Sequence, residues 1–538
     1  MATSATKQVN AIDHAHHYSE KALAMRRWFV LIGLVTAAVM EVLDTSIVNV
    51  AIPQISGNLG ATLDEIGWVA TGYIISNVIV LPMTSWLSSL FGRKRYLTGS
   101  IILFIIASVL CGTSHSLGEL IFWRVVQGAG GAALLSTAQA TLFEIFPREQ
   151  QGLVQALFGL GIVMAPTLGP TLGGIITDNY NWRWIFFINV PIGTISAILV
   201  MMFIDDSKYA RKRSSYVDWA GIGFLALGLG CLQTVLEKGE RDDWFQASWV
   251  VWCSAISIVT LTAFVFWQLN KKNTHPIVDL HILRTKSYAA GLPLAFALGM
   301  GLYGGVFIFP VFAQNLLHFT AQQTGMVLLP GGIATAVSMI GCGKFVRKVD
   351  PRLMLIVGFS IFIWSMFDLS NMTLQSGQQD TFLALMVRGF GLGFIFLPLT
   401  IVSVQTLPKS DIAQGAALFN LFRQLGGSFG IALLNTLIQN HINTYRAHFV
   451  QYANSANTLF TVREHALTGA FNHMGFDPVT AMNMANSVID HQVQGQASNL
   501  AFADAFRFMA CIFICVIPLL ALLKRPKFAP ADGGPPTH

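Results

Sequence analysis

Charged side chains are scarce in this sequence of 538 residues. Asp, Glu, Lys and Arg make up 11% of it, 53% of the residues are apolar, and the mean hydropathy is +0.57. An ordinary soluble domain has roughly 25% charged residues, so this composition predicts an integral membrane protein. We interpret the net charge of +6 as membrane anchoring, and we expect no nucleic-acid partner.

The sequence also lacks the motifs of several enzyme classes. It has no phosphate-binding P-loop, no zinc-protease His-Glu pair and no large soluble module, which excludes self-contained ATP-driven pumping. The six cysteines lie in apolar segments without metal-type spacing, and the histidines at positions 14, 16 and 17 show no ligating geometry. We therefore expect no metal, no cofactor and no catalytic site. The polar residues 1–27 lead straight into an apolar span, unlike a cleavable signal peptide.

Fourteen apolar windows approach or exceed the length of a bilayer span, which takes roughly 20 residues. They are centred on Trp28–Val50, Ile66–Leu90, Leu97–Gly112, Leu120–Phe143, Leu153–Ile176, Trp184–Ile204, Trp219–Leu236, Trp249–Leu269, Ala289–Leu317, Thr324–Val346, Leu353–Met372, Phe382–Leu407, Ile412–Ile438 and Ala505–Leu523. With the N-terminus in the cytoplasm, 24 of the 33 Lys and Arg residues fall in inside segments and 5 in outside loops. This bias predicts that both termini are cytoplasmic.

The chain repeats itself at an offset of about 260 residues. The matching features are Gly152 with Gly415, Arg124 with Arg388, the basic loop Leu87–Arg95 with Phe345–Arg352, and the helix start at Trp28 with that at Tyr288. These matches predict an all-α membrane protein of two six-helix bundles in the same orientation, at 28–204 and 288–523. Two inserted helices within 205–287 complete the 14, with cytoplasmic tails at 1–27 and 524–538. Residues 439–499 form an extracytoplasmic loop in this scheme.

The fifth window contains two prolines and several glycines. Pro166 and Pro170 each lack an N–H and are expected to kink the helix. Gly169 and Gly173 are four residues apart, Gly161 extends their face upstream, and Gly174 follows directly. Such a face allows close contact with another helix, either at a moving transporter interface or in a kinked structural helix.

Two carboxylates lie inside the first window. Glu41 and Asp44 are three residues apart and share one helical face. A charge at mid-bilayer costs roughly 2.5–3.5 kcal/mol, so each requires a partner or a function. The pair can load and release a proton, and it can attract a lipophilic cation. Alternatively, Asp44 is the structural ion-pair partner of Arg124.

Further polar residues interrupt the later windows. Arg388 is the repeat counterpart of Arg124, and Asn420, Arg423 and Gln424 form a polar patch in the thirteenth window. We interpret these residues as candidates for lining a cavity, with structural pairing between helices as the alternative.

Several motifs coincide with one family. They are Leu43–Pro53, the stretch Leu120–Arg124 with Gln127, Gly128 and Gly130, Trp182–Gly193, and Asp218-Trp219 with Leu232-Gln233 and Asp243–Phe245. Together they resemble the 14-helix drug:proton antiporters of the major facilitator superfamily, most closely the EmrB-type multidrug exporters, and the Gly/Pro motif of the fifth window resembles their antiporter signature. One departure is Ser89, which stands where the superfamily has an aspartate, while Arg93 and Lys94 remain and are candidates for headgroup anchoring.

The resemblance implies a proton-coupled exporter of lipophilic or cationic toxic compounds, driven by the proton gradient in a bacterial inner membrane. It implies that Asp44 and Arg124 take part in proton transfer, and it adds Gln127 as a candidate cavity residue. A role for Glu41 in proton coupling is inferred only from its spacing to Asp44. The loop at 439–499 is expected either to dock a periplasmic adaptor, with an outer-membrane channel beyond it, or to act as a passive lid. The alternatives are a proton-driven importer or exporter of a specific metabolite and, less expected, a membrane-embedded enzyme or sensor.

The topology predicts the sides on which reporter fusions will be found. A fusion after Lys527 should report the cytoplasm, and one at Ser455 should report the opposite side, because the basic residues follow the positive-inside rule. Paired alkaline phosphatase and fluorescent protein fusions measure this. Matching sides would contradict the count of fourteen helices.

Overall fold

The computed structural model describes residues 20–206, 217–270, 273, 276–346 and 348–523, and all regular structure in this part of the chain is helical. The expected tail at 524–538, most of the tail at 1–27 and the histidine cluster lie outside the described residues. Residues 20–27 of the expected N-terminal tail belong to the first helix, because their sequence continues without a helix breaker into the apolar span.

The first group of helices comprises α2 (Glu20–Leu59), α3 (Leu63–Val80) with η1 (Leu81–Met83) and α4 (Thr84–Phe91), α5 (Arg93–Thr113), α6 (Leu117–Ile145), α7 (Arg148–Asn179), α8 (Trp184–Phe187) and α9 (Asn189–Phe203). These helices pack mainly on one another. The inserted pair follows as α10 (Trp219–Lys238), η2 (Trp244–Gln246) and α11 (Ser248–Leu269), where α10 contacts α3 and α17 while α11 packs mainly on α10.

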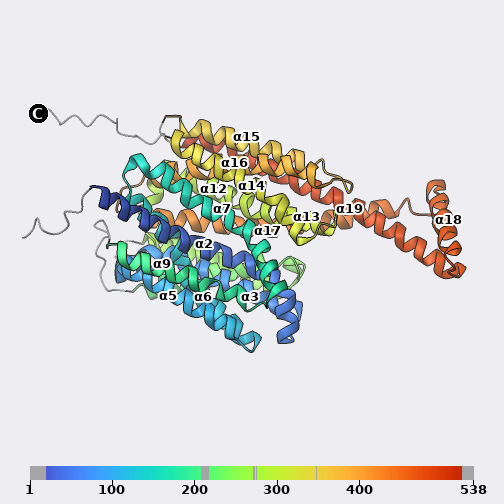
Figure 1. Cartoon of the computed structure of the whole chain (residues 1–538), viewed down its shortest axis with the longest axis horizontal. Helices are drawn as coiled ribbons and strands as arrows, with labels where there is room; N and C mark the ends of the chain where they lie inside the picture. The colour runs from blue at the N-terminus through green and yellow to red at the C-terminus, as the bar shows by residue number, and fades with distance from the viewer. Residues whose placement is uncertain (1–19, 207–216, 271–272, 274–275, 347, 524–538) are drawn as a thin grey trace, which may run out of the picture.

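The second group comprises η3 (Leu280–Arg284), α12 (Lys286–Gly299), the π-helical turn η4 (Met300–Gly304), α13 (Gly305–Asn315), α14 (Ala321–Phe345), α15 (Pro351–Leu369), α16 (Gln378–Val404), α17 (Ile412–Val450), α18 (Thr458–His473), α19 (Pro478–Val516) and η5 (Ile517–Leu522). In Figure 1 this group lies above the first, and α18 with the adjoining end of α19 projects far beyond the bundle.

Thirteen helical segments in the described part of the chain are long and apolar enough to cross a membrane. The window expected at Leu120–Phe143 is not among them, although it lies in α6, which has 29 residues and packs between α3 and α5. Most of α6 from Gly130 onward is buried by protein, so this helix needs little of the apolar surface that a lipid-facing helix requires. Its Gly, Gln, Ser and Thr residues therefore lower its hydropathy without exposing polar groups to lipid.

The glycine-bearing face of α7 packs directly on α2. A Cβ atom added at Gly173 would lie 3.0 Å from Ile47 Cγ1, and one added at Gly169 would lie 2.8 Å from Ser46 Cβ. A Cβ atom at Gly161 would also collide with α2. Both prolines lie inside α7, which continues as one helix past them.

The opposite face of α7 packs on α14, from the second group of helices. A Cβ atom added at Gly343 would lie 2.8 Å from Gly152 O, so the two backbones touch near one end of the contact. Near the other end, a Cβ atom at Gly325 would collide with the Thr171 hydroxyl. Because α7 belongs to the first group and α14 to the second, any shift of one helical group against the other must move the α7–α14 contacts.

The packing of α7 distinguishes two adjacent glycines. Gly173→Leu should insert normally but lose efflux, because overpacking commonly costs roughly 1–3 kcal/mol and the added side chain meets α2. Gly174→Leu is the matched control, since a Cβ atom at Gly174 would meet nothing within 4 Å. Drug accumulation in cells with equal membrane levels of each variant measures the difference. Wild-type efflux from Gly173→Leu, or equal loss in both variants, would contradict a sealed α2–α7 contact.

Candidate functional site

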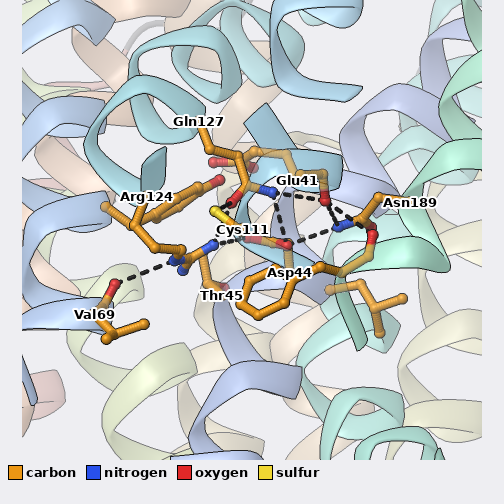
Figure 2. A network of polar contacts seen from close by, with 12 residues as sticks. Glu41, Asp44, Thr45, Val69, Cys111, Arg124, Gln127 and Asn189 are labelled. Atoms are coloured by element: carbon orange, nitrogen blue, oxygen red, sulfur yellow. Dashed lines mark hydrogen bonds and ion pairs between the residues drawn. The ribbon is translucent and has the colours of Figure 1, made fainter. Parts of the chain in front are cut away.

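The Asp44 carboxylate lies at the centre of a buried network in the first group of helices (Figure 2). Its Oδ1 atom accepts hydrogen bonds from Gln127 Nε2 at 3.1 Å and Asn189 Nδ2 at 2.8 Å. Its Oδ2 atom accepts from Arg124 Nη1, and this contact is also an ion pair. The side chain of Asp44 is fully buried, and protein groups from α6 and α9 donate these three hydrogen bonds.

Arg124 is held on several sides as well. Its Nε atom donates to the backbone oxygen of Val69 on α3 at 3.1 Å, and Nη1 also donates to Gln127 Oε1 at 2.7 Å. The guanidinium lies over the ring of Tyr73, 4.2 Å from its centroid. These contacts fix the cation beside Asp44, which is how a buried charge pair becomes tolerable in a low-dielectric interior.

A second ring of contacts ties α5 to the network. Ser108 Oγ accepts from Gln127 Nε2 at 3.2 Å and from Asn189 Nδ2 at 3.0 Å, and it donates to Phe186 O at 2.9 Å. Asn189 is the first residue of α9, directly after the break that separates α8 from α9. One carboxylate thereby connects α2, α5, α6 and α9, and Arg124 adds α3.

Glu41 lies one turn from Asp44 but in different surroundings. It is 5% exposed, and Oε1 accepts one hydrogen bond, at 3.1 Å, from Asn77 Nδ2 on α3. Asp44 has a guanidinium partner, whereas no ion pair to Glu41 is found among the described residues. The two carboxylates share a helix face, and the surrounding helices give them separate partners.

The candidate residues of the second group do not join the Asp44 network. Arg388 Nη1 donates to the backbone oxygen of Gly305 at 2.8 Å, beside η4. Asn420 Nδ2 donates to Gln139 Oε1 on α6 at 2.8 Å, which links the two groups. Gln424 is half-buried, and its side chain makes no hydrogen bond to the described part of the chain. Gln127, expected as a cavity residue, lies inside the Asp44 network.

Unpartnered polar atoms gather where the two groups meet. Arg423 is fully buried, its three guanidinium nitrogens have no hydrogen-bond partner among the described residues, and the ring of Phe396 lies 5.4 Å from its Cζ atom. Gln139 Nε2, Gln155 Oε1 and Asn420 Oδ1 are also buried without a partner there. Groups of this kind require a polar ligand or solvent in some state of the protein.

The basic segment after α4 has protein partners. Arg93 is buried and forms an ion pair with Glu144 on α6, and Lys94 N donates to Asp206 Oδ1 at 3.0 Å. The interpretation of Arg93 as a lipid-headgroup anchor was therefore wrong, because its side chain points into the protein. Ser89 Oγ donates to the backbone oxygen of Trp86 at 2.7 Å.

Three residues around the two carboxylates were not predicted as site residues. Asn189 and Asn77 bond to the carboxylates directly, and Ser108 bonds to Gln127 and Asn189. Asn189 lies in the motif Trp182–Gly193, which indicated the family without a role for this amide. Among the described residues, no group of three or more His, Cys, Asp or Glu side chains could hold a metal ion.

Fold and site together define a class of protein. Two groups of helices, most of them able to span a bilayer, with an ion pair buried inside one group, form the architecture of a polytopic membrane transporter. The chain belongs to the Major Facilitator Superfamily, whose family model matches residues 34–431. The family and fold class that the motifs predicted are confirmed.

Individual proteins resemble the chain over nearly its whole length. The multidrug export protein EmrB of Haemophilus influenzae is 32% identical over 487 residues, covering 90% of this chain and 94% of that protein. The fatty acid resistance protein FarB of Neisseria gonorrhoeae is 31% identical over 507 residues, covering 94% and 97%. The crystal structure of the human organic anion transporter MFSD10 has a TM-score of 0.59 at 11% identity, covering 93% and 99%. That last likeness concerns the fold alone.

Proposed function

We propose that the chain is a multidrug efflux transporter that exchanges a proton for a small lipophilic molecule across a bacterial inner membrane, with both termini in the cytoplasm. The similarity to EmrB over more than nine-tenths of that protein supports the efflux function. The positive-inside distribution of Lys and Arg supports the orientation. In this proposal, the proton gradient is the energy source, and no cofactor takes part.

The buried Asp44–Arg124 pair is the observation that carries the proposal. Protonation of Asp44 removes the negative partner of Arg124 and weakens the charge-assisted hydrogen bonds from Gln127 and Asn189. Those donors lie on α6 and α9, so one proton changes the interactions that hold α2 against two neighbours. A proton-binding group placed in this way can bias the packing of the helices between two states.

The proton supplies enough free energy for export. One elementary charge crossing 100 mV is worth about 2.3 kcal/mol. Since about 1.4 kcal/mol corresponds to a tenfold ratio, one proton can sustain a roughly fiftyfold gradient of a neutral drug. Exchange of one proton for one monovalent cation moves no net charge, which leaves only the pH gradient as the driving force.

The transported molecule is proposed to bind between the two helical groups. The unpartnered atoms of Gln139, Gln155, Asn420 and Arg423 and the ring of Phe396 combine polar and aromatic contacts there. Major facilitator transporters bind substrate at this kind of interface near the bilayer midplane. The α7 helix, packed on α2 and α14, is the element whose movement would open one side and close the other.

The projecting arm at 439–499 is the proposed docking surface for a periplasmic adaptor that leads to an outer-membrane channel. It consists of the end of α17, all of α18 and the start of α19 (Figure 1). Large apolar side chains are well exposed on it: Leu459, Val462, Met474 and Val479. In this proposal, these side chains provide the apolar contacts of the docking surface.

Asp44→Asn tests the proposal. Asparagine keeps the size and some hydrogen bonds of Asp44, but it cannot titrate and leaves Arg124 without its carboxylate. In everted vesicles, drug addition should no longer dissipate the proton gradient, and proton-driven drug uptake should fall roughly tenfold or more. Cationic drugs should be affected at least as severely as neutral ones.

The matched control is Asp368→Asn, because Asp368 is an acid on α15 whose side chain has no ion-pair or hydrogen-bond partner among the described residues. It should behave as wild type. Size-exclusion profiles will show whether Asp44→Asn folds. If it does not, Asp44→Glu is the second test, because it keeps a titratable group and should retain part of the coupling. Wild-type coupling in Asp44→Asn would place the proton elsewhere, with Glu41 as the next candidate, and drug accumulation in right-side-out vesicles would indicate an importer.

A further inference from the structure

Inside the two helical groups, the buried guanidinium groups outnumber the carboxylates that form ion pairs with them in the described part of the chain. Arg124 is neutralised by Asp44. Arg388 and Arg423, in the second group, have no carboxylate partner among the described residues, and Arg388 has the backbone oxygen of Gly305 instead. Glu41, in the first group, is a buried carboxylate with no ion pair among the described residues. The two helical groups thus each contribute an unmatched charge of opposite sign.

The surroundings of Glu41 come from several elements. Asp44 lies one turn away on α2 and is engaged with Arg124, while Tyr73 on α3 and Tyr303 on η4 are within electrostatic range of Glu41. On α6, the residue facing Glu41 is a glycine without charge, Gly131. In the described part of the chain, the Glu41 side chain accepts one hydrogen bond, from the neutral amide of Asn77.

Arg423 approaches the same place from α17. Arg423 lies one turn beyond Asn420, whose amide is bonded to Gln139 on α6, and α6 is the helix that faces Glu41 through Gly131. No direct ion pair between Arg423 and Glu41 is formed in this conformation. All three guanidinium nitrogens lack a hydrogen-bond partner among the described residues, and the side chain is fully buried. An uncompensated cation at such a position is costly, so a partner is expected in another state of the protein.

We propose that Glu41 and Arg423 form an ion pair between the two helical groups during the transport cycle, and that protonation of Glu41 breaks it. This proposal rests on the proposed proton-coupled function and adds a second protonation site to it. The proton adds to a carboxylate oxygen of Glu41, which cancels the negative charge and releases Arg423. The pair would then stabilise one arrangement of α2 against α17, whereas the Asp44–Arg124 pair acts within a single group.

A double-mutant cycle tests the pairing. Arg423→Gln leaves Glu41 without its cation and should lower the efflux rate roughly tenfold and change its pH profile. In the Glu41→Gln background, the same Arg423→Gln change should have a much smaller effect on efflux and leave the pH profile unaltered. The charge-exchanged variant Glu41→Arg with Arg423→Glu should recover efflux relative to either exchanged residue alone.

Arg388→Gln is the matched control. It also removes a buried guanidinium from the second group, but its effect should be the same with Glu41 or Gln at position 41. Detergent thermal stability of every variant separates folding from transport, and Glu41→Gln should restore stability to Arg423→Gln but not to Arg388→Gln.

Equal effects of Arg423→Gln in both backgrounds, without recovery in the charge-exchanged protein, would overturn the pair and assign Arg423 to drug binding or packing.

Asp44→Asn separates the two proposals. If Asp44→Asn abolishes coupling while the Glu41–Arg423 cycle is additive, then the second protonation site fails and the proposed function stands. If coupling survives in Asp44→Asn and the cycle is non-additive, then Glu41 is the principal site and the assignment to Asp44 fails.

Discussion

The cost of placing a charge inside a bilayer governs this structure. Asp44 and Arg124 are both almost completely buried, and each is tolerated because the other neutralises it. The neighbours Gln127, Asn189 and Ser108 come from α5, α6 and α9, so satisfying one carboxylate determines how four helices of the first group approach one another. In the proposed function, the same arrangement makes the packing of those helices sensitive to a single proton.

The repeat in the sequence predicts that the two helical groups correspond to each other, but they differ in charge. Arg124 and Arg388 occupy corresponding positions, yet Arg124 faces a carboxylate and Arg388 faces the backbone of Gly305 at the π-helical turn. The first group therefore pairs its buried guanidinium with a carboxylate, whereas the second contributes buried guanidinium groups that have no carboxylate partner among the described residues. The α7 helix connects these unequal parts through close contacts on two faces, with α2 on one and α14 on the other.

Composition and motifs predicted most of the architecture, because apolar length and the repeat offset are properties of the chain itself. They could not show which helices face one another. Asn189 and Asn77 are remote in sequence from the carboxylates they contact, and Arg93 is turned toward Glu144 only by the packing of α5 on α6. The α6 helix fell below the hydropathy of a typical span because protein, not lipid, surrounds much of it.

The most direct measurement is the release of protons when a transported drug binds to purified protein in weakly buffered detergent solution. If proton and drug alternate at the Asp44 network, drug addition to the wild-type protein releases protons, up to about one for each drug bound, and raising the pH through the titration of the site removes the release while drug still binds. Drug binding that releases no protons at any pH in this range would contradict the account.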